Sequence, residues 1–492
     1  MRKTIEPQMI LGEVDISKIE FDPRSRDDIP QILKGLQHIY CTPELREKVF
    51  QILEKIVPED TDANNGRPGM DLWKILVLGV IRLNCDWDYD RLKEMADHHM
   101  GLRQMLGHNM FNSDKKYALQ TLKDNVSLLT LEVLDEISQV VVNAGHMIVK
   151  KKHGEGLRSR CDSSVVETDV HFPTDIWCLF DAIRKVIILT SRLSDALETS
   201  GWRQYKHNCN NIKNMLRRIQ RKKHSTSKNG EKKEKRKQLI LDLYQEYLNL
   251  VNKFFLRART TIKEARGTIG ESKTIAEIEH YMGFAEKLMD QVNRRVILGE
   301  TIEHEEKIFS VFEEHTEWIS KGKAGKPVEL GLKVCFLEDQ YQFILHHRVM
   351  EKEADNQVAV SMVVEAKEKF PDLNNCSFDQ GFWSPSNYEL LNKILEEVIL
   401  PKKGKLSVDE KIRQATEYFI RGRKQHPAIE SAQNALNHHG LDRCPDHGID
   451  GFKLYVALGI VGRNIQNLGR IILEKEKKNL KKERRRKMRL AA

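Results

Sequence analysis

The feature that most limits the fold of this chain is a long helical stretch between two groups of strand-like segments. After Asp175 the apolar residues follow helical spacing as far as about residue 318, and the runs from Leu239 to Phe255 and from Ala276 to Val296 are amphipathic. A segment of this length is too long to be a loop inside a compact domain. The sequence therefore predicts a helical insertion at 190–318, in the form of a hairpin or a coiled-coil arm.

Strand patterns occur on both sides of the predicted insertion. Before it, the run from Arg160 to Val166 is rich in small and β-branched residues. After it, apolar and polar residues alternate from Val328 to Leu345 with a turn at 338–340, which predicts a hairpin. The pattern then predicts a helix at 355–370, a strand at 375–379, a helix at 386–397 and a strand at 398–401. The fold class is therefore α/β, with a mixed-sheet core formed by residues 157–189 and 319–475.

The two ends of the chain have different patterns from the core. The pattern of residues 1–150 predicts an N-terminal helical domain. The strongly apolar helix predicted at 72–83 should be buried within it. The other helices predicted there lie at 45–57, 90–100 and 129–149. Residues 476–492 form a basic tail, which we expect to be flexible in the free protein.

Three acidic residues on separate predicted elements are candidate metal ligands. Asp162 lies in the first strand, Asp379 ends a later strand before a glycine turn, and Glu430 lies on a helix that begins at Pro427. Mg²⁺ binds oxygen ligands and takes only one or two carboxylates, so its sites need few acids and no compact motif. Two such ions, roughly 4 Å apart, stabilise the attacking and leaving oxygens of a phosphodiester displacement.

Two of the three acids also have a purely structural interpretation, and the first acid has alternatives. Asp379 can cap the turn that follows it. Glu430 shares a polar helix face with Gln433 at i+3, and that face can simply be solvated. Glu167 and Asp169 are alternative first acids if the strand is shifted in register.

The ordered set of motifs resembles the DDE transposases of bacterial insertion sequences, and within them the ISNCY group. The resemblance covers most of the chain, and each motif is weak by itself. It rests on Asp162 to Glu167, His171 to Asp175, Phe378 to Phe382, Ile429 to Ser431 and Gly440 to Cys444, together with Gly66 to Leu72, Gly322-Lys323 and the strand from Val328 to Val334.

The resemblance implies an RNase H-like catalytic core that cuts and joins double-stranded DNA at transposon ends. It assigns the catalytic and metal-binding roles to Asp162, Asp379 and Glu430, with two Mg²⁺ ions that Mn²⁺ can replace. It also implies a homodimer or larger assembly on DNA, and a role for the N-terminal domain in binding DNA ends or in dimerisation. No helix-turn-helix pattern identifies a recognition helix there.

The sequence departs from the family pattern next to the glutamate. Many relatives have an arginine four residues before it and a lysine seven residues after it, where this chain has His426 and Asn437. Arg423, Lys424 or His438 can take over that contact with DNA. A second basic cluster, which includes Arg221 and Lys222, can bind phosphates along the duplex or can be a solvated face.

Composition and the distribution of charge predict the kind of partner and the compartment of this protein. The net charge of +9 is modest, but Lys and Arg are clustered, as at 217–224, 228–237 and 481–487, which favours a polyanionic partner. No apolar run is long enough to span a bilayer, and the first residues have no apolar signal core. The eight cysteines show no pairing pattern, so we expect reduced thiols in a cytoplasmic protein that joins the bacterial nucleoid when bound to DNA.

Other residues near these motifs have weaker functional interpretations. His438, His439, Cys444 and His447 are close in sequence, but their spacing is not that of a zinc finger. We expect Asp175 to cap the first helix of the insertion and Cys161 to pack inside the sheet.

Besides a transposase, the pattern allows a nuclease of the same fold without joining activity, or an inactive DNA-binding protein derived from a transposase.

Overall fold

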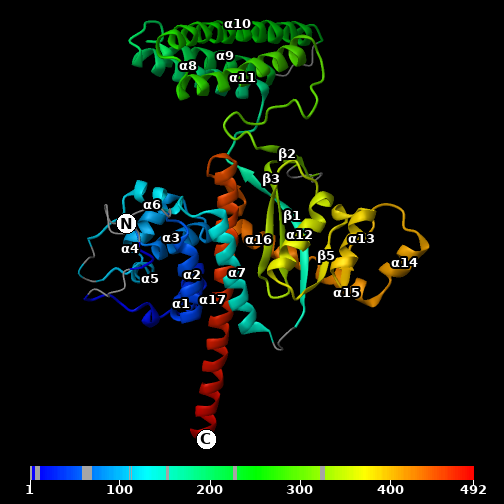
Figure 1. Cartoon of the computed structure of the whole chain (residues 1–492). Helices are drawn as coiled ribbons and strands as arrows, with labels where there is room; N and C mark the ends of the chain where they lie inside the picture. The colour runs from blue at the N-terminus through cyan, green and yellow to red at the C-terminus, as the bar shows by residue number, and fades with distance from the viewer. Residues whose placement is uncertain are drawn as a thin grey trace. The chain divides into compact units, whose positions relative to one another are not determined.

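The computed structural model describes residues 3–5, 11–57, 69–109, 111, 114–150, 155–224, 230–321 and 327–491. The chain divides into two compact units, one formed by Met1–Asp169 with Gly331–Ala492 and the other by Val170–Leu330 (Figure 1). The second unit contains the whole of the predicted insertion at 190–318. The motif residues Gly66, Arg67 and Pro68, the pair Gly322-Lys323 and Lys228 in the basic cluster lie outside the described residues.

A mixed sheet with β1 (Leu157–Thr168) inside it forms the centre of the first unit. β1 is antiparallel to β3 (Val328–Asp339) on one side and parallel to β5 (Leu373–Phe378) on the other. The sheet is extended by β4 (Ile344–Met350) against β3, by β6 (Glu397–Ile399) against β5, and by β7 (Arg443–Cys444) against the end of β1. β2 (Glu317–Ser320), whose residues belong to the second unit, also pairs with β3. The sheet therefore contains both parallel and antiparallel pairs.

Short helices connect the strands after the β3–β4 hairpin. α12 (Asp355–Lys369) leads to β5, and α13 (Pro385–Ile394) leads to β6. As the sequence predicts, the Ser384 hydroxyl caps α13 by accepting a hydrogen bond from the Asn387 N–H, and Pro385 lies in its first turn. After β6 come α14 (Val408–Gln414), α15 (Glu417–Gln425), α16 (Ala428–Leu436) and the π-helical turn η5 (Asn437–Leu441).

The N-terminal helices share one hydrophobic core with the sheet. α3 (Leu72–Asn84) is buried along its whole length, as its apolar sequence predicts. α7 (Leu131–Val149) and α17 (Gly448–Ala491) lie between the N-terminal helices and the strands, and both contact β4 (Figure 1). The remaining helices of this part are η1 (Ile16–Lys18), α1 (Asp28–Cys41), α2 (Pro43–Glu54), α4 (Tyr89–His98), α5 (Met100–Met105) and α6 (Leu119–Val126).

The second unit is a helical bundle with its own core. It contains α8 (Asp175–Ala196), α9 (Tyr205–His224), α10 (Gly230–Ile269), α11 (Lys273–Val292) and the π-helical turn η3 (Asn293–Ile297). α8 packs against α9, α10 and α11, and Ile183, Tyr247 and Ile278 are buried in the shared core. A segment without regular helix or strand follows, from 298 to 316.

Several sequence-based expectations differ from the structure in detail. The basic tail has regular helical structure, because α17 continues as one helix from Gly448 to Ala491. The helix predicted at 90–100 is broken at His99, whose ring caps α5 by accepting from the Leu102 N–H. β3 continues through Asp339, so the hairpin turn comes slightly later than predicted. Among the described residues no helix is long and apolar enough to cross a membrane.

Candidate metal and nucleic-acid site

Asp162 and Asp379 lie at the same level of two neighbouring parallel strands. The paired residues of β1 and β5 end at Cys161 and Phe378, and the two aspartates are the next residues on each strand. Asp379 then leads into the 3-10 turn η4 (Gln380–Phe382), where the Phe382 N–H donates to its carbonyl oxygen. The two acids that the sequence places 217 positions apart are thus neighbours in the sheet.

The environment of Asp162 disfavours its negative charge. Burial is the main cause that raises the pKa of its carboxyl to about 6, and the nearby charges of Asp379 and Asp355 add to this rise. Two hydrogen bonds act in the opposite direction, one from the Ser163 N–H at 2.8 Å and one from the Gln433 amide at 3.0 Å. The charges of Asp379 and Asp355 are therefore close enough to influence the ionisation of Asp162.

The hydrogen bond from Gln433 fixes the face of α16 that is turned toward β1. Glu430 lies one turn before Gln433, so both belong to the polar face that the sequence predicts. The Glu430 side chain is exposed. Within the described part of the chain no three His, Cys, Asp or Glu side chains are close enough to hold a metal ion, so the three predicted acids do not form a complete ligand set as they stand.

Asp355 is a member of this region that the sequence reasoning missed. It is the first residue of α12, and its carboxylate accepts a hydrogen bond from the Ser163 hydroxyl at 2.7 Å. Its other oxygen pairs with the Lys333 amine at 3.1 Å. The signal in the sequence was that Asp355 is an acid at the start of a predicted helix. Such acids are common because they complement the helix dipole, so this signal did not single out Asp355.

Two basic side chains of α15 lie near Asp379. The Arg423 guanidinium lies 4.0 Å from the Asp379 carboxylate and donates to the Phe378 carbonyl at 3.2 Å. Arg423, the exposed Lys424 and Asp379 line one open pocket of about 570 Å³. Of the predicted DNA-binding residues, these two are therefore beside Asp379.

His426 and His438 have different environments. His426 is buried, and burial together with the charge of Arg423 lowers its pKa to about 4. Its Nδ1 lies 3.0 Å from the Ser377 hydroxyl, so it is a neutral packing residue at neutral pH and cannot supply the charge of the arginine found in the relatives. His438 is exposed on η5, just after α16.

Arg221 and Lys222 belong to the second unit. Both are exposed near the end of α9, where Arg217, Arg218 and Lys223 add further positive charge. They form a basic surface of that unit.

The structure gives the alternative candidates other roles. Glu167 and Asp169 both pair with Arg443, at 3.7 and 3.5 Å. Cys161 is packed inside the sheet as expected, with its sulfur 3.4 Å from that of Cys335. Asp175 is not the cap of α8, because Thr174 accepts the hydrogen bond from the Trp177 N–H; Asp175 lies in the first turn and pairs with Arg295 at 2.7 Å.

The zinc interpretation receives no geometric support. The described residues include His438, His439, Cys444 and His447, and no metal-binding group is found among the described histidines, cysteines and acids. The ring of His439 is instead 2.6 Å from the Asn84 carbonyl oxygen, which ties η5 to α3.

No family model, curated protein or solved structure matches this chain. What the site can do has to be argued from its own side chains. Asp162 and Asp379 fit a hard divalent cation, because both are oxygen donors and because a nearby cation would favour the ionised form of the buried Asp162 carboxyl. Arg423 and Lys424 beside them fit an anionic substrate such as a phosphodiester.

Proposed function

We propose that the chain is a DDE-type transposase, which cleaves double-stranded DNA at the ends of an insertion sequence and transfers the strand to a target. The proposal rests mainly on the position of Asp162 and Asp379, which lie next to each other on adjacent parallel strands. The hydrogen bond from Gln433 to Asp162 holds α16 over the same place. Acids at the ends of sheet strands are a common position for functional groups.

The order of the elements supports an RNase H-like core. From the β3–β4 hairpin the chain continues through α12, β5, α13 and β6, which is the order of hairpin, helix, strand, helix and strand that such a core needs. The sheet has β5 beside β1 and β6 beside β5, so the later strands extend the parallel side. The helical unit enters the chain between β1 and β3.

In this proposal Asp162, Asp379 and Glu430 hold two Mg²⁺ ions, for which Mn²⁺ can substitute. Bound Mg²⁺ would activate a water or a DNA 3′-hydroxyl and stabilise the leaving oxygen. Gln433 keeps the Asp162 carboxylate oriented, and its amide favours the ionised form. Arg423 sits beside Asp379, where its charge can bind the phosphate that flanks the cut.

The proposed DNA contacts are backbone contacts. Arg423, Lys424 and His438 lie on α15 and η5, the helices on either side of α16, and Arg221 and Lys222 belong to the second unit. Phosphate contacts of this kind position DNA without reading its sequence. We further propose that the chain acts in the cytoplasm on nucleoid DNA, as a homodimer or larger assembly that brings two ends together.

The test uses the full chain with a labelled duplex that carries the DNA flanking its gene. We expect Mg²⁺-dependent cleavage at inverted repeats and transfer of the labelled 3′ end into a plasmid. Asp162→Asn, Asp379→Asn and Glu430→Gln should each reduce cleavage by at least about 100-fold while leaving duplex binding intact. Asp372→Asn is the matched control, because Asp372 is an exposed acid just before the other end of β5.

Each outcome has a definite meaning. Cleavage without strand transfer would replace the proposal by a nuclease of the same fold. A variant that cuts at the parental rate would remove that residue from the catalytic set. Duplex binding with no cleavage under any divalent ion would favour an inactive DNA-binding derivative.

A further inference from the structure

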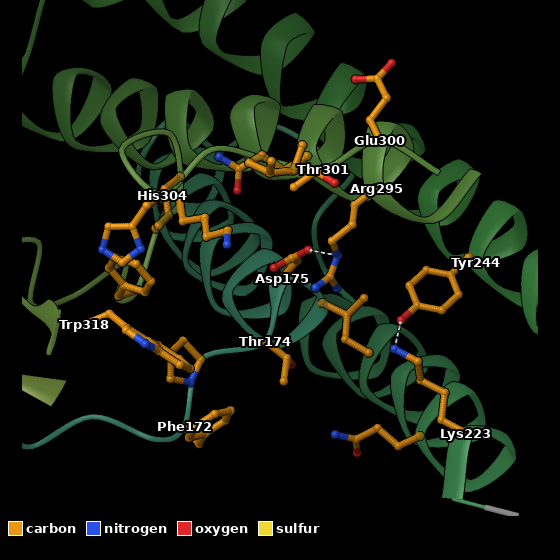
Figure 2. Close-up of a pocket in the computed structure, with 18 of the residues that line it drawn as sticks. Phe172, Thr174, Asp175, Lys223, Tyr244, Arg295, Glu300, Thr301, His304 and Trp318 are labelled. Carbon is orange, nitrogen blue, oxygen red and sulfur yellow. Dashed lines mark hydrogen bonds and ion pairs between the residues drawn. The ribbon is translucent and has the colours of Figure 1, made fainter. Parts of the chain in front are cut away.

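The second unit contains a pocket that the proposed DNA cleavage does not use. Its volume is about 720 Å³, within the range of small-molecule and cofactor sites. Its wall is formed by the start of α8, the end of α9, part of α10, and the irregular segment that follows η3 (Figure 2).

One side of this pocket is aromatic. The Trp318 ring has Phe172 at 5.5 Å in an edge-on arrangement and Phe309 at 5.8 Å in a tilted one, measured between ring centroids. The Phe172 side chain is 63% exposed, an unusual position for a large apolar ring. Figure 2 shows Trp318, Phe172 and His304 on one side of the pocket. Partly exposed rings of this kind provide stacking surface for a planar ligand.

The other side of the pocket carries positive charge. The Lys223 amine donates to the Tyr244 hydroxyl at 2.9 Å, and that neutral partner leaves its charge uncompensated. Lys307 also lines the pocket, is exposed, and has no ion-pair partner among the described residues. Figure 2 shows Lys223, Tyr244 and Arg295 across the pocket from Trp318.

The acids of the pocket are already paired. Asp175 pairs with Arg295 at 2.7 Å and Glu300 with Arg294 at 2.9 Å. With the acids neutralised, Lys223 and Lys307 give the pocket an excess of positive charge. A cationic ligand, which aromatic walls alone would allow, is therefore disfavoured relative to an anion.

We propose that this pocket binds one nucleotide, with its base stacked on Trp318 and its phosphate directed toward Lys223 and Lys307. An aromatic wall facing cations is the combination used to hold unstacked bases together with their backbone. The nucleotide can be free in solution or can be an unpaired residue of a single strand, since both offer the same ring and phosphate. The proposal does not depend on the chemistry at Asp162.

The test is a calorimetric titration of the full chain with adenosine monophosphate, with a short single-stranded oligonucleotide and with inorganic phosphate. We expect Trp318→Ala to weaken nucleotide binding about tenfold and Trp318→Phe to restore most of it, because stacking needs a ring and not the indole itself. Lys223→Ala and Lys307→Ala should weaken it by several-fold. Lys253→Ala, an exposed lysine on α10 outside the pocket, is the charge-matched control and should have no effect.

Binding of the monophosphate that depends on Trp318 would support a free nucleotide as the ligand, and binding of the oligonucleotide alone with the same dependence would support an unpaired residue of a strand. If neither ligand binds in a Trp318-dependent manner, or if inorganic phosphate binds as tightly as the nucleotide, the proposal is overturned. Circular dichroism of each variant shows whether the unit is folded. Asp162→Asn should leave this binding unchanged, so a failure here is distinguishable from a failure of DNA cleavage.

Discussion

Asp162 and Asp379 stand side by side one residue beyond the last paired residues of β1 and β5. Asp162 continues within β1, where it pairs with Phe336 of β3, whereas Asp379 is the first residue after β5. Burial, with a smaller contribution from the charge of Asp379, raises the pKa of Asp162, so the ionised carboxylate costs stability in the folded state. Ionisable groups whose charged form is penalised in the native state are frequent at functional sites.

Asp162→Asn should stabilise the protein at neutral and alkaline pH in the absence of divalent ions. The folded-state pKa of about 6 is above the ordinary value of 3.8, so the ionised carboxylate is penalised only in the native state. The gain in free energy of unfolding should be about 1–3 kcal/mol at pH 8, should shrink as the pH falls through 6, and should be absent below about pH 4. Denaturant unfolding at several pH values measures it. A variant less stable than the parent at pH 8 would contradict the unfavourable burial of the ionised Asp162 carboxylate.

Mg²⁺ should stabilise the parental chain and not the Asp162→Asn chain. A ligand that binds only the native state adds about 1.4 kcal/mol when its concentration is ten times its dissociation constant. Thermal unfolding with and without MgCl₂, against NaCl of equal ionic strength, separates specific binding from screening. Asp379→Asn should lose the shift as well, whereas an undiminished shift in both variants would place the ion elsewhere.

Gln433→Ala should move the acidic limb of the cleavage pH profile to higher pH. The Gln433 amide hydrogen bond lowers the pKa of Asp162, so its removal makes the carboxylate harder to ionise. Near pH 6 we expect roughly a tenfold loss of rate that recovers at pH 8, since a hydrogen bond to a charged group contributes about 1.5 kcal/mol. Asn434→Ala, the next residue on α16, is the control and should leave the profile in place. A loss of rate that is equal at all pH values would indicate a different role for Gln433.

Local patterns in the sequence were sufficient to locate the two aspartates. A run of small and β-branched residues around Asp162 predicted the first strand, and a short strand ending in an acid and a glycine turn predicted the position of Asp379. The i, i+3 spacing on α16 predicted the shared face of Glu430 and Gln433. The interruption of the sheet by helices was predicted from segment length alone. All these signals are short-range, because periodicity and capping act within a few residues.

The relationships that join distant residues could not be predicted in this way. The hydrogen bond from Ser163 to Asp355 connects residues 192 positions apart. The burial of His426 depends on its contact with Ser377 in β5, and nothing in the helical pattern of α15 indicates it. β7 was missed because a two-residue strand has no period to detect, and it exists only through its pairing with β1.

Gly469→Ala should strongly destabilise the first unit. A Cβ at Gly469 would lie 1.9 Å from the Gln31 carbonyl oxygen and 2.7 Å from the Gly35 nitrogen, so α1 and α17 would have to separate. Backbone atoms cannot move aside as side chains do, and we expect a loss of about 3 kcal/mol in the free energy of unfolding. Gly451→Ala on the same helix meets atoms only at 3.7 Å and is the control. Equal unfolding midpoints for the two variants would refute the close crossing.

His426→Asn should make the protein less sensitive to acid. The pKa of His426 is lowered to about 4 in the folded state, mainly by burial, from an ordinary value of 6.5. Its contribution to stability is therefore fully present above pH 6.5 and is lost as the pH falls through 4, by about 3 kcal/mol in total. Asparagine keeps an amide near the Ser377 hydroxyl but does not titrate, so the slope of stability against pH between 6.5 and 4 should become shallower. His438→Asn replaces an exposed histidine and should leave that slope unchanged; if both variants behave alike, His426 is not the buried titrating group.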